Sequence, residues 1–499
     1  MNSTESKLFR RRQFLIGPDL PFFESWHKFR ISNNLFMVSH PDLPVTYTEK
    51  NNNKIFLLGY ILDPSRPEFS DIDIIRSLIE DIISLDSIII KLDRLTGRFV
   101  LIVFLGENLY VFHDPCGLRQ VFYCFDKDGK FWSASQPNLL AEILDLSYDP
   151  IMLEYKNLPL FISGRDEFWF PCDLSPYKEI KYLLPNHYLD INNKSVKRYW
   201  PRINSFGKLD LDEFVDKVSK LLQSTIEAAA TRFPLVMGIS AGWDSRKSLA
   251  ASRSVKDKII FYTHTPIKGN EADAEIPATL LPKLGLKHNL IELTPMDENF
   301  KKYFEINNTW PRERHGHIAY SFIRHFGPDR VVLNSNISEY YGVWYWLPKK
   351  KINGRNLAML RMISNKKIIE ELDKWLLDAR PACEQANMNI LVLFDLELRS
   401  RWVSQALSEY DIAFETLNPY NNRNLFHLEL SVDEKIREGR NPYLPKALIK
   451  KMWPDVLSEP INPEKDTLKK IKKFILTKKF LFPVLRNIKY IQMRISFKV

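Results

Sequence analysis

The stretch RFPLVMGISAGWDSRKSLAASR, residues 232–253, constrains the fold more than any other part of the chain. A short apolar run, residues 235–239, ends in a loop of small, hydroxylated and acidic residues, and a helix-compatible segment follows directly. Such a run is typical of a strand buried on both faces of a parallel sheet. Backbone N–H groups at a strand–helix junction, together with the helix dipole, favour an anion. The stretch therefore predicts an α/β unit with a phosphate-binding loop.

The loop has residue types that suit the phosphates of a nucleotide. Its first three residues are small, which lets a phosphate approach the backbone, and Asp244 suits a Mg²⁺ ion that also binds phosphate oxygens. Arg246 adds positive charge in the first helical turn. A plainer interpretation, in which Ser240 only caps the helix, stays open. The predicted ATP-binding residues are Ser240, Ala241, Gly242, Asp244 and Ser245.

Strand-like and helix-like segments alternate on both sides of this stretch. Apolar residues recur every three or four positions over residues 211–232, which predicts an amphipathic helix. Further strands are predicted at 258–265, 288–293 and 330–336, and a further helix at 274–286. This alternation indicates βαβ units and a doubly wound parallel sheet. From about residue 355 onward the pattern is mostly helical.

The first 200 or so residues are predicted to be mainly strands. Four short segments are rich in aromatic and β-branched residues: 54–62, 98–105, 108–114 and 120–126. The middle two predict a hairpin that turns at Gly106, Glu107 and Asn108, while residues 71–85 have helical periodicity. We therefore expect an α/β protein with a β-sheet-rich domain at 1–203, a parallel-sheet domain with a helical end at 204–464, and a basic tail at 465–499.

The composition excludes several classes of protein. Hydrophobic residues make up 45% of the 499 residues and aromatic residues 13%, which is a globular composition. The four cysteines show no CxxC spacing, so a reducing compartment fits best. The chain start lacks the apolar core of a signal peptide, and no window approaches the roughly 18 apolar residues of a membrane-spanning helix. These features predict a soluble, cytoplasmic protein.

The net charge of +10 lies almost wholly in the tail. Residues 465–499 hold eleven Lys or Arg and one Asp, so the remaining residues are close to neutral. A nucleic-acid surface along the whole chain is therefore not indicated. Three interpretations of the tail stay open: an amphipathic helix packed on the body, contact with a membrane surface or an anionic partner, and, as the weakest, nucleic acid.

Several motifs resemble those of the asparagine synthetase family. SAGWDSR, residues 240–246, is similar to the family's SGGxDS pyrophosphatase loop. Segments 95–135 and 182–200 resemble its N-terminal glutamine amidotransferase-like (Ntn-type) domain, and FETLNPYNN, residues 414–422, resembles a later synthetase motif. The resemblance implies that this domain is followed by an ATP-pyrophosphatase-like domain. It also implies a protein that binds ATP, releases pyrophosphate and adenylates a carboxylate.

The chain departs from the family at the glutaminase position. Members that hydrolyse glutamine carry a cysteine at position 2, whose thiol attacks the amide. Here that position holds Asn2, and the nearest cysteine, Cys116, lies far along the chain. The resemblance therefore implies a domain without glutaminase activity, as in β-lactam synthetases and lasso-peptide cyclases. The nitrogen would then come from ammonia or from a substrate amine.

A second family motif, SGxGADELFGG, corresponds here to LNSNISEYYGV, residues 333–343. Glu339 and Gly342 match it, whereas Asn336 stands at a glycine position and Ser338 at that of the metal-binding Asp. This leaves Asp244 as the one matched Mg²⁺ ligand. The candidate catalytic residues are Glu339 and Arg246. The late lysine that stabilises charge in the family is not matched, because Lys465 is offset from its position.

The resemblance implies an ATP-dependent, AMP-forming amide ligase acting on a small-molecule or peptide carboxylate. The alternative is a catalytically impaired relative that serves as a nucleotide-binding or assembly component, for example in polysaccharide or peptide biosynthesis. RERHGH, residues 312–317, is expected near the substrate pocket, with metal ligation by its histidines as a second interpretation. Glu271 and Asp273 mark either a charged helix start or a catalytic pair.

Overall fold

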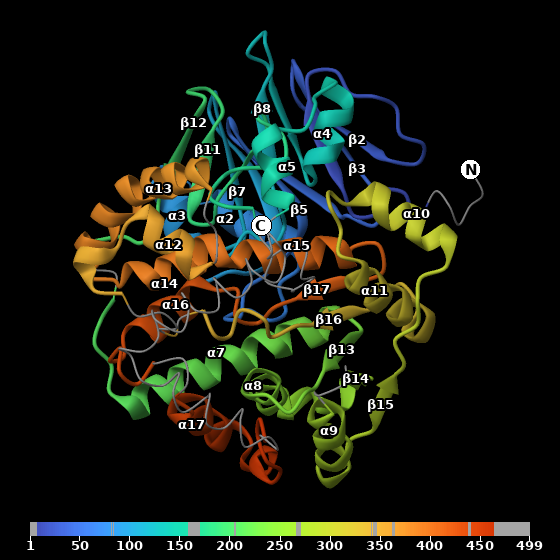
Figure 1. Ribbon diagram of the computed structural model, residues 1–499, viewed down its shortest axis with the longest axis vertical. Helices are drawn as coiled ribbons and strands as arrows, with labels where there is room; N and C mark the ends of the chain where they lie inside the picture. The colour runs from blue at the N-terminus through green and yellow to red at the C-terminus, as the bar shows by residue number, and fades with distance from the viewer. Residues whose placement is uncertain are drawn as a thin grey trace.

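The computed structural model describes residues 7–80, 82, 84–157, 170–203, 206–265, 271–340, 342, 347–361, 365–437 and 441–463. The described strands form two antiparallel six-stranded sheets and one parallel five-stranded sheet (Figure 1). The antiparallel sheets precede the parallel sheet along the chain, and helices dominate the C-terminal part. The protein is therefore of the α/β class, as predicted.

The two antiparallel sheets stack on each other and share a core. Phe56 and Leu58 of one sheet pack in the same apolar cluster as Phe14 and Ile16 of the other. The first sheet contains β1 (Phe14–Gly17), β2 (His27–Ser32), β3 (Leu35–Ser39), β8 (Phe122–Phe125), β9 (Phe131–Ala134) and β10 (Lys181–Tyr182). The second contains β4 (Val45–Lys50), β5 (Asn53–Leu62), β6 (Thr96–Leu105), β7 (Asn108–His113), β11 (His187–Asp190) and β12 (Ser195–Arg198).

The four strands predicted in this region are present, and so is the predicted hairpin. Leu105 of β6 pairs with Asn108 of β7, which leaves Gly106 at the turn with a φ of 60°. The single helix predicted at 71–85 is instead two helices, because Ser84 caps a new helix with its side chain. The helices of this part are α2 (Asp71–Glu80), α3 (Leu85–Leu92), α4 (Pro137–Leu144) and α5 (Pro150–Lys156).

The parallel sheet has the strand order β15-β14-β13-β16-β17 and is covered by helices on both faces. Along β13, Leu235 and Met237 pack in the cluster that includes Leu222 of α7, whereas Val236 packs with Phe322 of α11. The strands are β13 (Leu235–Gly238), β14 (Ile260–His264), β15 (His288–Ile291), β16 (Val331–Leu333) and β17 (Glu415–Leu417). Helix α7 (Leu211–Arg232) precedes β13, and the helices between the strands include α8 (Trp243–Ala251), α9 (Ala272–Lys283), α10 (Glu298–Asn307) and α11 (Glu313–Phe326).

The described residues after 354 are mostly helical, as predicted, apart from β17. It contains α12 (Gly354–Leu360), α13 (Lys366–Gln385), α14 (Ile390–Phe394), α15 (Ser400–Tyr410), α16 (Arg423–Leu430) and α17 (Tyr443–Met452). Short helical turns are η1 (Arg253–Lys258), η2 (Lys349–Lys351), η3 (Asp395–Arg399) and η4 (Pro454–Leu457). In Figure 1, α15 and β17 lie between the antiparallel sheets and the rest of the parallel sheet.

Buried ion pairs join the part of the molecule that contains the antiparallel sheets to the part that contains the parallel sheet; these are its two halves. Arg98 of β6 contacts Asp411, and it contacts Glu415 of β17 at 2.8 Å. Arg119 contacts Glu415 at 2.6 Å, and the Tyr60 hydroxyl donates to the Thr416 carbonyl at 2.5 Å. The strand that ends the parallel sheet is therefore fixed to the antiparallel sheets.

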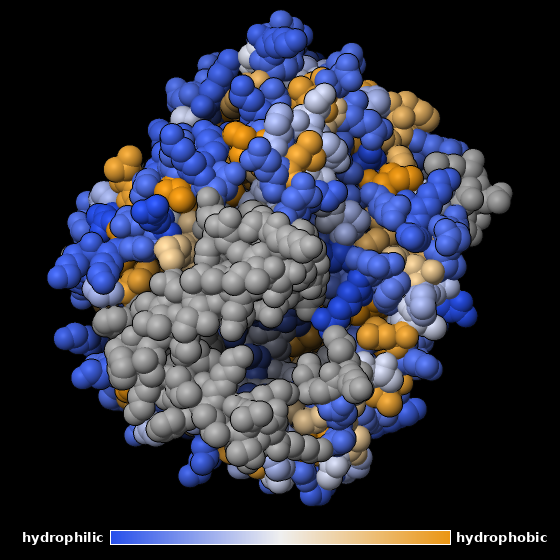
Figure 2. All heavy atoms as spheres, in the orientation of Figure 1, coloured by the Kyte–Doolittle hydropathy of each residue, from blue (hydrophilic) through white to orange (hydrophobic). Residues whose placement is uncertain are grey.

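The described residues on the face shown in Figure 2 are mostly hydrophilic. On the face shown in Figure 2, apolar side chains of the described residues occur singly or in small groups among polar ones. Among the helices that the structure describes, none is long and apolar enough to cross a membrane. The predicted basic tail, residues 465–499, lies outside the described residues, so its three interpretations stay predictions.

Candidate phosphate-binding site

The loop predicted to bind phosphate lies at the point where the parallel sheet reverses its order. The chain proceeds from β13 outward to β14 and β15, and then returns to the other side of β13 for β16 and β17. In doubly wound sheets, ligands bind outside the carboxyl ends of the strands at this position. Residues 239–242 leave β13 there and lead into α8.

Two serines hold the loop in shape. The Ser245 hydroxyl accepts from the Ser240 backbone N–H at 3.1 Å and lies 3.0 Å from the Ser240 hydroxyl. The Ser240 hydroxyl in turn accepts from the Gly242 N–H at 3.2 Å. The N-cap of α8 is Gly242, which provides no capping side chain, so Ser240 does not cap the helix. The first turn of α8 is thus left with N–H groups suited to an anion.

Two cavities flank this loop, and Ser240 lines both. One, of about 240 Å³, lies beside the end of β14 and is lined by His264, Asp273 and Arg314 among others. The other, of about 360 Å³, lies toward β16 and is lined by Asp244, Ser245, Asn336, Glu339 and Trp402 among others. Together they give room for a ligand on each side of the loop.

One residue lining each cavity has a buried ring nitrogen without a hydrogen-bond partner among the described residues. These atoms are Nδ1 of His264, which lines the smaller cavity, and Nε1 of Trp402, which lines the larger one. Burial, with Arg314 nearby, lowers the pKa of His264 to about 4, so its ring is neutral at neutral pH. Buried polar atoms are usually paired, so these two nitrogens are candidates for pairing with a bound ligand.

Asp244 is engaged by protein groups at the edge of the larger cavity. Its Oδ1 accepts from the Ser338 hydroxyl and lies 3.5 Å from Nζ of Lys247. Lys247 also donates to the Ser338 carbonyl at 3.2 Å, and its ammonium lies 5.1 Å from the centre of the Tyr420 ring. The Lys247 side chain is only 9% exposed, whereas that of Asp244 is 44% exposed.

The residues present do not form a resident Mg²⁺ site. Mg²⁺ takes oxygen ligands, usually one or two carboxylates with phosphates and waters. Here Asp244 is already paired with Lys247, and Oδ1 of Asp273 accepts from the Ala241 N–H at 3.1 Å. Among the described residues, no group of three or more His, Cys, Asp or Glu side chains is arranged to hold a metal ion.

Arg246, a candidate catalytic residue, is fully buried away from both cavities. It donates to the carbonyls of Val456 at 2.7 Å, Glu459 at 3.3 Å and Pro460 at 3.0 Å. Burial lowers the pKa of its guanidinium to about 10. Residues 459–463 are thereby held against the loop, where the Asn462 N–H donates to the Ala241 carbonyl at 2.9 Å. Lys465 lies outside the described residues.

The second predicted motif lies where the resemblance implies, after β16. Glu339 lines the larger cavity and pairs with Arg399 at 2.7 Å. The Asn336 N–H donates to the Asn334 side chain at 2.8 Å, which turns this loop without glycine. Because Ser338 contacts Asp244, the two loops predicted from separate motifs meet in one site.

The histidines at 312–317 have protein partners. His315 lies 2.7 Å from Glu409, which Arg312 also contacts at 3.1 Å, and Nδ1 of His317 accepts from the Met296 N–H. Burial alone would raise the pKa of Glu409, but Arg312 and His315 hold it below its ordinary value. Nothing among the described residues forms a metal centre here.

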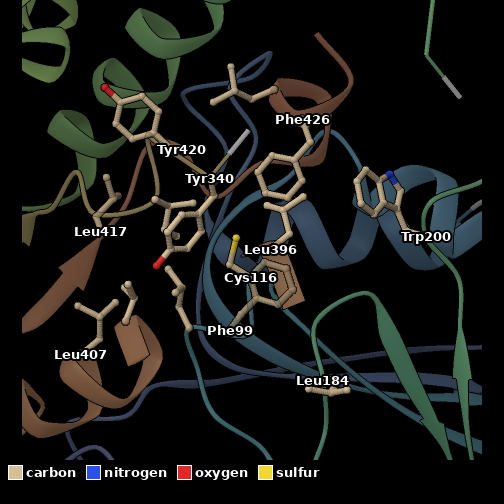
Figure 3. Packing of buried hydrophobic residues seen from close by; sticks show 14 of the residues in the cluster. Phe99, Cys116, Leu184, Trp200, Tyr340, Leu396, Leu407, Leu417, Tyr420 and Phe426 are labelled. Carbon is tan, nitrogen blue, oxygen red and sulfur yellow. The ribbon is translucent and has the colours of Figure 1, made fainter. Parts of the chain in front are cut away.

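All four cysteines are buried and unpaired. Figure 3 shows Cys116 among Phe99, Tyr340 and Leu396, where the two halves of the molecule meet. Burial raises the pKa of the Cys116 thiol well above its ordinary value, which makes it a poor nucleophile. Asn2 lies outside the described residues.

Sequence reasoning did not find Lys247 or Asn462. Lys247 looks like a solvent-facing helix residue, and its only signal was its spacing of three from Asp244, which places both on one side of α8. Asn462 is more than 200 residues from the loop it contacts and gave no local signal.

The fold and the site define an α/β protein with a doubly wound sheet and an anion-suited loop at its reversal point. No family profile and no curated protein matches the chain. Among solved structures, a glutamine phosphoribosylpyrophosphate amidotransferase from B. subtilis complexed with ADP and GMP is similar, with 13% identity and a TM-score of 0.24 over 52% of this chain and 62% of that one. The match thus spans less than two thirds of that chain.

Two NAD synthetases are similar as well. The glutamine-dependent enzyme from Acinetobacter baumannii, in complex with ADP, is 15% identical with a TM-score of 0.19, over 44% of this chain and 41% of its own. The NH3-dependent enzyme from Campylobacter jejuni, in complex with nitrate, is 15% identical with a TM-score of 0.22, over 40% of this chain and 96% of its own. Likenesses at these scores establish neither a family nor an activity for this chain.

Proposed function

We propose that the chain is an ATP-dependent, AMP-forming amide ligase that uses ammonia or a substrate amine and has no glutaminase of its own. One observation carries the proposal: the loop at 239–245 lies at the reversal point of the parallel sheet, starts a helix without a capping side chain and separates two cavities. This arrangement suits a ligand with phosphates on the loop and a group on either side.

The proposed chemistry has two steps. A carboxylate oxygen of the substrate attacks the α-phosphorus of ATP, and the bond to the bridging oxygen breaks to release pyrophosphate. The amine nitrogen then attacks the acyl carbon, AMP leaves with the electron pair of the broken C–O bond, and the amine loses a proton. N–H groups of the loop that hold the leaving pyrophosphate would stabilise the charge that develops in the first step.

The two cavities divide the ligand between them in this proposal. The smaller cavity, with His264 and Tyr262, would take the nucleoside, and the larger one, with Trp402 and Glu339, the carboxylate substrate. Nε1 of Trp402 has no hydrogen-bond partner in the described part of the chain, and it is a donor suited to an oxygen of that substrate. Arg246 would act as a positioning residue that holds residues 459–463 on the loop, and not as a catalytic one.

A second function, nucleotide binding without turnover, is favoured by one observation. Oδ1 of Asp244 already contacts Lys247 and Ser338, which disfavours a metal ion on this carboxylate beside the phosphates. In this case the chain would serve as a nucleotide-binding or assembly component.

Exchange of labelled pyrophosphate into ATP tests the first proposal against the second. The purified protein is offered amino acids, peptides and sugar acids as carboxylates, and the acyl-adenylate is trapped with hydroxylamine. Exchange that depends on one carboxylate and is lost in Trp402→Phe supports the ligase. Nucleotide binding with no exchange for any carboxylate supports the binding function, and exchange without any carboxylate contradicts the mechanism.

A further inference from the structure

We propose that Lys247 takes the place of a metal ion at this site. Its ammonium neutralises Asp244, so that the loop binds nucleotide phosphates without a divalent cation. The inference rests on the proposed nucleotide site and concerns how that site balances charge.

Lys247 is held in place by the protein and is hardly accessible to water. Its side chain is 9% exposed, and it lies 3.5 Å from Asp244 Oδ1 and 3.2 Å from the Ser338 carbonyl oxygen. The ring of Tyr420 lies beside it, with 5.1 Å between the ammonium and the ring centre. A buried ammonium needs such partners, and Asp244 is the carboxylate that forms an ion pair with it.

This arrangement disfavours a dication bound to Asp244. Oδ1 receives both the Ser338 hydroxyl and the Lys247 ammonium. A Mg²⁺ ion on this carboxylate would lie within a few ångströms of the ammonium, where like charges repel strongly in a partly buried site. The ion would also have to displace the Ser338 hydroxyl or share the carboxylate with it.

The same arrangement suits phosphate. Asp244 stands in the first turn of α8, and as a lone carboxylate it would repel a phosphate on the N–H groups there. Paired with Lys247, the Asp244 carboxylate no longer opposes the positive field of the uncapped helix start. Arg314, which lines the smaller cavity, adds positive charge on the other side of the loop.

Calorimetric titration of ATP into the full-length protein, once with EDTA and once with Mg²⁺, tests the inference. We expect dissociation constants in the two buffers that agree within about threefold, a difference well under the tenfold that 1.4 kcal/mol represents. Binding with Mg²⁺ alone would overturn the metal-free site and leave the proposed nucleotide site standing. No binding in either buffer would overturn both.

Two variants probe the charge balance directly. Lys247→Met leaves Asp244 without its cation, so ATP affinity in EDTA should fall by more than about tenfold and Mg²⁺ should restore it. Ser338→Asp adds a second carboxylate while it keeps Lys247, and should also make binding depend on Mg²⁺. This second variant tests the inference even if Lys247→Met does not fold.

The matched control is Lys217→Met, which removes an exposed lysine of α7 that pairs with Glu213 at 2.6 Å. Its ATP affinity should equal that of the unmodified protein in both buffers, and Lys247→Arg should retain metal-free binding. If Lys247→Met and Ser338→Asp both bind ATP equally well in EDTA and in Mg²⁺, Lys247 does not replace a metal.

Discussion

Arg246 shows how a single charged side chain near the loop serves the structure. Its buried guanidinium satisfies three carbonyls of the segment that lies against the loop. In Arg246→Met these carbonyls lose their donor, and we expect the free energy of unfolding to fall by about 2–4 kcal/mol. Urea unfolding measures this change. The exposed Arg76→Met is the control, expected within about 0.5 kcal/mol of the parent; equal losses in the two variants would contradict the anchoring role.

Glu429 gives the protein a pH-dependent stability. Burial raises the pKa of its carboxyl to about 7, against the opposing influence of Lys247 and Arg437, from an ordinary value of 4.5. At a pH between these two pKa values, the folded state binds a proton that the unfolded state does not. The contribution of Glu429 to the free energy of unfolding therefore falls as pH rises from about 4.5 to about 7.

Glu429→Gln removes this titration. Relative to the parent, the variant should therefore gain stability between about pH 5 and pH 8, by at most a few kcal/mol. Thermal unfolding at several pH values measures the difference. Parallel pH profiles for the two proteins would show that the carboxyl is not held in its neutral form.

At this scale the sequence predicted the residues of the loop but not their partners. Ser240, Asp244 and Ser245 were found because a strand, a loop and a helix follow one another locally. Lys247 was overlooked because a lysine in a helix is normally expected to face solvent. In α8, however, all residues from Ser245 to Ala251 are buried, the polar ones included. Ser338 was interpreted as the loss of a metal-binding Asp, because only the structure shows that its hydroxyl contacts Asp244.

Among the elements, β17 depends most on contacts far away in the chain. It has three residues, and Glu415 at its start accepts from Arg98 and Arg119 of the antiparallel sheets. Arg98→Met would leave two buried carboxylates, Asp411 and Glu415, short of a cation. We expect a loss of about 3–5 kcal/mol in the free energy of unfolding, measured in urea.

The control for this prediction is an exposed ion pair. Lys217→Ala breaks the pair with Glu213 on α7 and should cost less than about 1 kcal/mol. A loss in Arg98→Met as small as in this control would mean that the buried pairs do not fix β17.

Elements with an apolar run or a clear periodicity were predictable, including the short strands β15 and β16, whereas β17 was not. The strands β5, β6 and β13 and the helix α7 follow from their apolar periodicity. β17 lacks an apolar run, and it forms because β16 and the antiparallel sheets provide its partners. The break between α2 and α3 was missed because the cap at Ser84 interrupts a pattern that otherwise looks continuous.

For the whole molecule, polar contacts across the two halves predict cooperative unfolding. Arg401 of α15 donates to the carbonyls of Phe170 and Leu174, and Arg198 of β12 contacts Glu397 of η3. We expect a single urea transition, with coincident curves from tryptophan fluorescence and far-ultraviolet circular dichroism. Two separated transitions would mean that the halves unfold independently.

The order of the parts along the chain was predictable, because alternating short strands and the later βαβ pattern have distinct periods. How the parts meet was not, because the contacts pair residues such as Arg98 and Asp411, more than 300 positions apart. The boundaries at 203 and 464 and the role of the basic tail stay predictions.

The central claim is that a nucleotide sits on the loop at residues 240–245. Gly242→Val tests it, since a Cβ at Gly242 would lie 3.3 Å from the Ser240 hydroxyl and 3.5 Å from the Asn462 side chain, within the loop itself. Gly207→Val is the matched control, because a Cβ there meets nothing within 4 Å. In calorimetric titrations with ATP, we predict that Gly242→Val loses more than about tenfold in affinity while Gly207→Val binds like the parent. Equal affinity in all three proteins, or no binding by the parent, would contradict the account.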